Sequence, residues 1–146
     1  MSTPETTTTF SPSTAPGAPP LDRRIVLAGL WTAMLFVFAY VDIFAFYRAD
    51  VLQGALAGQI SGPGFEINQM FLALTTGYIL LPSLMVAGSL LLPTRVNRIT
   101  NIVLACIYAL TIVGSMVGET WAYYLIGSVV EVGLLGAIAA VAWRLR

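Results

Sequence analysis

The sequence predicts an all-α fold, a bundle of four transmembrane helices with both termini in the cytoplasm. Of its 146 residues 58% are hydrophobic and only 10% charged, a composition that a water-soluble domain rarely has. Four apolar stretches are each close to the length of about 20 residues that a helix needs to cross a hydrocarbon core of about 30 Å. The arginines gather on one side of these stretches, as they do in the cytoplasmic loops of membrane proteins.

The start of the chain differs in composition from the rest. It is rich in Thr, Ser, Pro and Ala, with Glu5 as its first charge and Phe10 as its aromatic residue, so it buries too little apolar surface to order itself. We predict that residues 1–22 form a disordered cytoplasmic tail and residues 23–146 the transmembrane domain. The apolar stretch after Arg23 and Arg24 is too long for a signal-peptide core and is expected to stay as a membrane anchor.

The predicted transmembrane helices cover about residues 25–46, 67–92, 99–118 and 121–143. Pro82 removes a backbone donor from the second helix and is expected to kink or tilt it. Only Glu119 and Thr120 separate the third helix from the fourth, so these two should form a tight antiparallel hairpin.

Arginine positions predict the orientation of the bundle in the plasma membrane. Arginine pairs precede the first helix, separate the second from the third and follow the fourth: Arg23, Arg24, Arg95, Arg98, Arg144 and Arg146. Short arginine-rich loops stay in the cytoplasm, so both termini are predicted there. Arg48 lies on the other side with Asp50, Glu66 and Glu119, which makes the predicted outer face acidic.

The first outer loop is long enough to fold on its own. Val51, Leu52, Ala55 and Leu56 form an apolar stripe that predicts a short helix lying on the membrane surface. Glu66 is expected in the first turn of the second helix, where the helix dipole favours an anion. The alternative is that Glu66 guards an entrance.

Two acids are predicted at membrane depth, Asp42 and Glu131. Glu131 lies ten positions after Trp121, roughly 15 Å into the bilayer. An ionised carboxylate there costs about 2.5 to 3.5 kcal/mol, and the four helices contain no Arg or Lys to offset it. We therefore expect Glu131 to be protonated and hydrogen-bonded, as in a proton relay or a cation site.

Structural roles are equally compatible with these acids. A hydrogen bond between helices would let either acid hold the bundle together, and Asp42 has the further alternative of pairing with Arg48. We name Asp42, Glu131, Gln69 and Glu66 as the candidate intramembrane polar site. Other polar residues expected in the outer half of the bundle, near Glu131, are Tyr40, Thr75, Thr76, Ser115, Tyr123, Tyr124 and Ser128.

Composition also limits the chemistry of the protein. The chain has no His, a single Cys at Cys106 and a formal net charge of zero. It therefore lacks the usual ligands of haem and zinc, cannot form an internal disulfide, and has no excess of positive charge for nucleic acid. We expect no cofactor, no metal and no nucleic-acid partner.

Small residues predict how the helices pack. Gly114 and Gly118 form a GxxxG pattern in the third helix, and Gly133 and Gly136 start similar patterns in the fourth. We expect these to pack within the chain, with a homo-oligomer or another membrane protein as the alternative partner beside the lipid bilayer.

Four short segments stand out together: the run from Tyr40 to Phe44, the run from Gly64 to Ile67, Asn97 and Arg98 with Asn101, and Glu131 with Val132. In these segments the chain resembles an uncharacterised family of small bacterial four-helix membrane proteins. The resemblance covers nearly the whole chain from Leu21 onward and implies the fold, but no activity. From the residues alone, Asn97 and Asn101 are expected to cap a helix start and Arg98 to contact lipid phosphates.

The leading functional interpretation is a non-enzymatic bundle. It would serve either as an accessory or interaction subunit or as a small proton- or cation-linked carrier that uses Asp42 and Glu131. The carrier hypothesis predicts a polar cavity open to the outer side. A membrane enzyme acting on a lipid or quinone ranks last, because the sequence offers no recognisable nucleophile, metal site or phosphate-binding loop.

Overall fold

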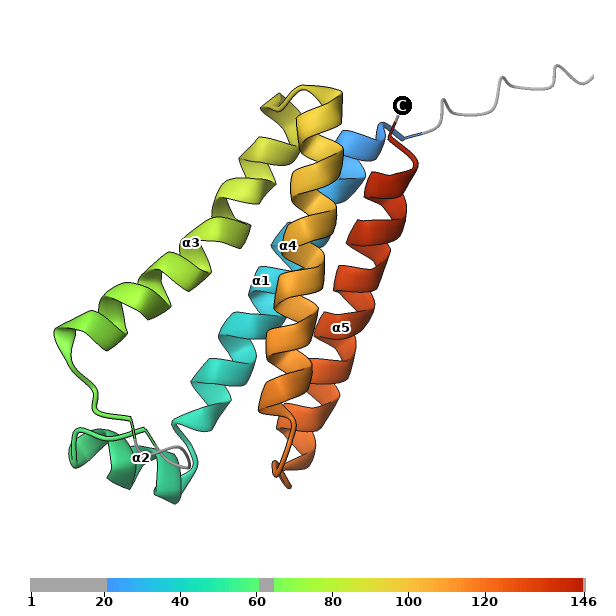
Figure 1. Ribbon diagram of the computed structural model, residues 1–146. Helices are drawn as coiled ribbons and strands as arrows, with labels where there is room; N and C mark the ends of the chain where they lie inside the picture. The colour runs from blue at the N-terminus through green and yellow to red at the C-terminus, as the bar shows by residue number, and fades with distance from the viewer. Residues whose placement is uncertain (1–20, 61–64, 146) are drawn as a thin grey trace, which may run out of the picture.

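The computed structural model describes residues 21–60 and 65–145, and this part of the chain is all-helical (Figure 1). The helices are α1 (Arg23–Ala45), α2 (Ala49–Leu56), α3 (Gln69–Leu91), α4 (Thr94–Ser115) and α5 (Ala122–Trp143). All but α2 are long and apolar enough to cross a membrane, which confirms the predicted all-α fold with four candidate transmembrane helices. The short helix predicted in the first outer loop is α2. The tail predicted for residues 1–22 lies almost wholly outside the described residues.

The four long helices are not packed equally. α1 packs against α3 on one side and α5 on the other, α4 packs against α5, and α3 has only slight contact with α4. Figure 1 shows α3 leaning away from α4 toward its own N-terminal end, where the chain comes up from α2. The bundle therefore has α1, α4 and α5 packed together, and α3 packs mainly against α1 at its edge.

The start of α1 and the end of α5 lie at the same end of the bundle (Figure 1). The Arg23 guanidinium donates a hydrogen bond to the backbone carbonyl of Arg144. Arg24 donates at 3.1 Å to the Leu90 carbonyl and at 3.1 Å to the Thr94 hydroxyl, which ties α1 to the turn between α3 and α4. We call this end, which carries Arg23, Arg24, Arg95, Arg98 and Arg144, the arginine-rich end, and the opposite one the Arg48 end.

A buried polar network fills the half of the bundle near the arginine-rich end. The Trp31 indole N–H donates to the Asn101 Oδ1 at 2.7 Å, and the Asn101 amide donates to the Asn97 Oδ1 at 2.6 Å. The Asn97 amide in turn donates to the Ser89 carbonyl at 2.6 Å. These side chains therefore link α1, α3 and α4 inside the membrane, where unsatisfied polar groups are costly.

The prediction that Asn97 and Asn101 cap a helix start is wrong. α4 begins at Thr94, directly after Pro93 at the N-cap position, and both Asn side chains are fully buried. Their spacing of four residues places them on one face of α4, so they serve the core. The polar residues from Thr94 to Arg98 suggested a loop, whereas they form the first turns of the helix.

Close helix packing occurs at a different glycine from those predicted. A Cβ at Gly127 of α5 would overlap the Cγ2 of Val41 on α1, whereas Cβ atoms at Gly114, Gly133 and Gly136 would meet nothing within 4 Å. Gly118 lies after the end of α4 and has a positive φ of 84°, which only glycine adopts readily. The predicted packing through the GxxxG pattern is therefore not found, and α1 and α5 approach each other through Gly127.

Candidate functional site

A cavity of about 230 Å³ lies in the half of the bundle near the Arg48 end. All four long helices contribute to its wall. It is lined by Phe38, Val41 and Asp42 of α1, Tyr78 of α3, Thr111, Ile112 and Ser115 of α4, and Tyr124 and Glu131 of α5. Two of the four residues predicted for the site, Asp42 and Glu131, thus come together at this cavity.

Glu131 is the buried acid of the cavity. It shares the inward face of α5 with Ser128 and Leu135, and its side chain is only 3% exposed. Its Oε1 atom is buried and has no hydrogen-bond partner among the described residues. The hydrogen bond between helices that we expected of Glu131 is not found in this part of the chain, although a buried polar oxygen normally has one.

Asp42 lies at the rim of the cavity, three residues before the end of α1, and is exposed. Arg48 is not its partner. The Arg48 Nη1 is 3.0 Å from the Glu119 Oε2 and its Nη2 is 2.7 Å from the Asp50 Oδ2. The alternative that Asp42 pairs with Arg48 is therefore wrong, because two nearer carboxylates occupy the guanidinium.

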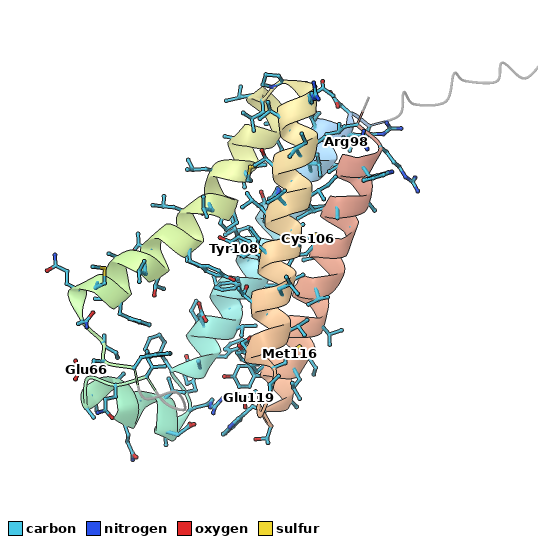
Figure 2. All side chains as sticks on the ribbon, in the orientation of Figure 1. Glu66, Arg98, Cys106, Tyr108, Met116 and Glu119 are labelled. Carbon is cyan, nitrogen blue, oxygen red and sulfur yellow. The ribbon has the colours of Figure 1, made fainter. Side chains whose placement is uncertain are left out.

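Arg48, Asp50 and Glu119 form a group that we call the Arg48 cluster. It joins the segment after α1 to the turn between α4 and α5, where Glu119 is labelled in Figure 2. The guanidinium also lies 4.7 Å above the Trp121 ring. Its hydrogen bond to Asp50 raises the pKa of Arg48 and lowers the pKa of Asp50. Burial alone would raise the pKa of Glu119, but hydrogen bonds from the Trp121 N–H, Arg48 and the Thr120 N–H lower it overall. All three groups are therefore ionised at neutral pH.

Hydroxyl groups on the cavity wall are mostly engaged with one another. The Tyr78 hydroxyl lies 2.6 Å from the Thr111 Oγ1, which itself donates to the Tyr108 carbonyl, so Tyr78 is the donor of the pair. The Tyr124 hydroxyl donates to the Ser115 Oγ at 2.8 Å. These bonds fix the two phenol rings against α4.

Sequence reasoning missed Tyr78, Thr111 and the apolar wall. One signal was available for Thr111, because it stands four residues before Ser115, a spacing that puts both on one helix face. No comparable signal in the sequence indicates Tyr78, whose position depends on which helices are neighbours.

Glu66 and Gln69 lie outside the cavity. Gln69 is the first residue of α3 and is exposed, while Glu66 precedes the helix and forms an isolated β-bridge with Gln59. Asn68 caps α3 by accepting a hydrogen bond from the Phe71 N–H at 2.9 Å. The prediction that Glu66 falls in the first turn of this helix is thus wrong. Figure 2 shows Glu66 beside α2, near the start of α3 and apart from Glu119 at the α4–α5 turn.

The fold and the cavity define a multi-pass helical membrane protein with two acids at a cavity in its membrane-spanning region. Residues 20–146 match the model of a family of unknown function, DUF6326, and the chain belongs to this family. The match confirms the resemblance to an uncharacterised family. Comparisons with curated proteins and with solved structures gave no match.

Proposed function

We propose that this protein is a small proton- or cation-linked carrier in which Glu131 and Asp42 bind the transported or coupling ion. One observation carries the proposal: the Glu131 Oε1 is buried in the wall of a cavity and has no hydrogen-bond partner in the described chain. An intramembrane acid is costly. A carboxyl group that holds the bundle together would be expected to form hydrogen bonds to neighbouring helices with its oxygens.

The same site can take either a proton or a cation. A protonated Glu131 is neutral and tolerable in a medium of low dielectric constant, whereas an ionised Glu131 needs a positive charge beside it. No arginine is among the residues that line the cavity within the described ranges. The compensating charge must therefore come from the cavity itself, which makes a proton and a bound cation competitors.

We further propose that the arginine-rich end faces the cytoplasm and the Arg48 end the outer side of the plasma membrane. Short arginine-rich segments favour this orientation, and the described termini lie together at the arginine-rich end (Figure 1). In this orientation the cavity lies in the outer half of the bundle, where the carrier hypothesis expects it.

A role as an accessory subunit of a larger membrane assembly is the second candidate. It is favoured by α3, which is the least buried of the membrane-spanning helices and has only slight contact with α4. In both candidates we assign the chain no covalent chemistry. The two differ in whether the protonation of Glu131 matters.

Infrared difference spectroscopy of the full chain in lipid tests the carrier proposal. We expect a protonated carboxyl band that titrates across a pH series, shifts when sodium is added, and disappears in Glu131→Gln. Glu66→Gln is the matched control, because Glu66 is an acid outside the cavity, and it should leave the band unchanged. A Glu131 band that ignores both pH and cations would overturn the proposal and favour the accessory role.

A further inference from the structure

We propose that the cation bound in this cavity is a small organic ammonium ion, held by the carboxylates of Glu131 and Asp42 and by the aromatic rings around them. This inference rests on the proposed function and names the class of its ligand. Four features of the cavity support it: its charge, its aromatic wall, its scarcity of free oxygen ligands and its size.

The charge of the cavity calls for a cation. Glu131 is 3% exposed with an unpartnered Oε1, and Asp42 stands at the rim, where it can attract a cation before it enters. Arg48, the arginine of that end, is held by Glu119 and Asp50. It therefore does not neutralise either acid of the cavity.

The aromatic wall distinguishes an organic ammonium ion from a bare metal ion. Phe38, Tyr78 and Tyr124 all line the cavity, and the Phe38 and Tyr78 rings lie 6.0 Å apart. The negative face of an aromatic ring attracts cations, and groups of such rings are the usual receptors of quaternary ammonium ions. Val41 and Ile112 add apolar surface that suits alkyl groups on nitrogen.

Oxygen ligands for a bare metal ion are scarce. The carboxylates that line the cavity are those of Asp42 and Glu131, and the hydroxyl groups of Tyr78, Thr111 and Tyr124 are held in place by the hydrogen bonds that they donate within the wall. Hard metal ions replace their water with several oxygen ligands, yet no group of three acids, Cys or His that could hold one occurs in the described ranges. An ammonium ion that carries its own apolar substituents needs fewer such ligands.

The size of the cavity limits the ligand. Its volume of about 230 Å³ lies below the range of about 300–1,000 Å³ that is usual for drug-sized ligands. A methylated or short-chain ammonium ion therefore fits better than a large amphiphilic cation. When it binds to protonated Glu131, the carboxyl group becomes a carboxylate paired with the ammonium ion, and one proton is released to the solvent.

Proton release provides the test. The full chain, reconstituted in lipid nanodiscs in weakly buffered solution with a pH-sensitive dye, is titrated with tetramethylammonium chloride and, separately, with sodium chloride. We expect saturable proton release with tetramethylammonium at concentrations where sodium gives little, and none with either salt in Glu131→Gln. Glu66→Gln should behave as the wild type.

Aromatic variants test the wall. Phe38→Leu should weaken tetramethylammonium binding roughly two- to thirty-fold, the range expected for the loss of one cation–π contact, while the small sodium response stays the same. Phe36→Leu is the matched control, because this ring is on the same helix but exposed and outside the cavity. Tyr124→Leu provides a second ring variant should thermal unfolding show that Phe38→Leu is not folded.

The outcomes separate this inference from the proposed function. Equal proton release by sodium and tetramethylammonium, with no effect of either ring variant, would overturn the organic ligand and leave the cation-linked site standing. Tetramethylammonium binding that survives Glu131→Gln would also overturn it, because the ligand would then lie elsewhere. Absence of proton release with both salts, together with an infrared band of Glu131 that does not titrate, would overturn both proposals.

Discussion

The Tyr108 hydroxyl of α4 donates a hydrogen bond to the backbone carbonyl of Tyr78 in α3. That carbonyl needs a donor from outside its helix, because Pro82, four residues later, has no N–H to offer. The two phenol rings also lie 4.5 Å apart, and Figure 2 shows Tyr108 on the side of α4 that faces α3. The proline is thus accommodated by a partner on a neighbouring helix, at a point where α3 and α4 otherwise have little contact.

We expect Tyr108→Phe to lower the free energy of unfolding by about 0.5–2 kcal/mol, the usual range for hydrogen bonds between membrane helices. In a Pro82→Ala background the backbone N–H at position 82 returns, so the same substitution should cost less. A double-mutant cycle on the unfolding of the protein in mixed micelles measures this coupling. Equal costs in the two backgrounds would show that Tyr108 does not compensate for Pro82.

Asn101 joins Trp31 to the buried polar network. Asn101→Leu would leave the Trp31 indole N–H without a partner in the core, and we expect a loss of about 1–3 kcal/mol in the free energy of unfolding. Trp31 fluorescence, measured with Trp121 and Trp143 replaced by Phe, should report the loss of the bond. Ser83→Ala is the control, because this hydroxyl only bonds to the Ile79 carbonyl of its own helix. Comparable losses of unfolding free energy in both variants would show that the hydrogen bond between Trp31 and Asn101 has no special part in stabilising the core.

Gly127 and Gly133 lie on the same helix but should respond differently to an added methyl group. Gly127→Ala would collide with Val41, so we expect α1 and α5 to separate slightly and the melting temperature in detergent to fall. Gly133→Ala meets nothing within 4 Å and should be neutral or stabilising. Val41→Ala should rescue the first variant but not change the second. If Gly127→Ala melts like the wild type, the close contact between α1 and α5 is not rigid.

The Arg48 cluster predicts a pH dependence at the end of the bundle outside the membrane. The pKa of Glu119 is lowered from its ordinary value of 4.5, so its ionised form stabilises the folded turn above that value. This contribution is lost as the pH falls through the lowered pKa, and it is small because the cluster is near the surface. The Thr120 and Trp121 N–H groups donate to the Glu119 Oε1 at 2.8 and 3.0 Å, so their NMR shifts should titrate with a midpoint below 4.5.

Arg48→Gln removes one of the groups that lower the pKa of Glu119, and the midpoint should move upward in this variant. Glu66→Gln serves as the control, since Glu66 lies outside the Arg48 cluster. A wild-type midpoint at or above 4.5, or one that ignores Arg48→Gln, would show that the guanidinium does not stabilise the Glu119 carboxylate.

The orientation of the bundle can be measured with single cysteines in a Cys106→Ser background. A membrane-impermeant maleimide applied to intact cells should label Gln53→Cys, in α2 near the Arg48 end, but not Pro93→Cys, in the turn at the arginine-rich end. Permeabilised cells, in which both should react, control for access. Labelling of Pro93→Cys alone in intact cells would mean that the protein has the opposite orientation.

The transmembrane helices and the two acids were predictable because each depends on a local property of the sequence. Apolar length identifies a membrane span wherever its neighbours lie, and a carboxyl group at membrane depth is costly in any bundle. Asp42 and Glu131 could therefore be named without knowing that α1 packs beside α5. The start of α4 was harder to predict, because Asn97 and Arg98 are polar and look like loop residues in the sequence. Their place in the helix becomes clear only from the core, where Asn101 bonds to Trp31.

The wall of the cavity could not be predicted for a different reason. Tyr78 and Phe38 are ordinary residues for a membrane helix, and their place at the cavity follows from the order of packing, in which α1 lies between α3 and α5. That order differs from the order along the chain. The same holds for Arg48, whose nearest acid along the chain at membrane depth is Asp42 but whose partners in space are Asp50 and Glu119.

The buried network of Trp31, Asn101, Asn97 and Ser89 lies between the cavity and the arginine-rich end. Asp42 lines the cavity and is exposed near the Arg48 end, whereas these hydrogen-bonded side chains fill the bundle toward the other end. In the proposed carrier, this conformation would be open toward the Arg48 end and closed toward the arginine-rich end. In the opposite state of such a carrier the hydrogen bond between Trp31 and Asn101 would have to break, so exchange between the two sides would depend on this network as well as on Glu131 and Asp42.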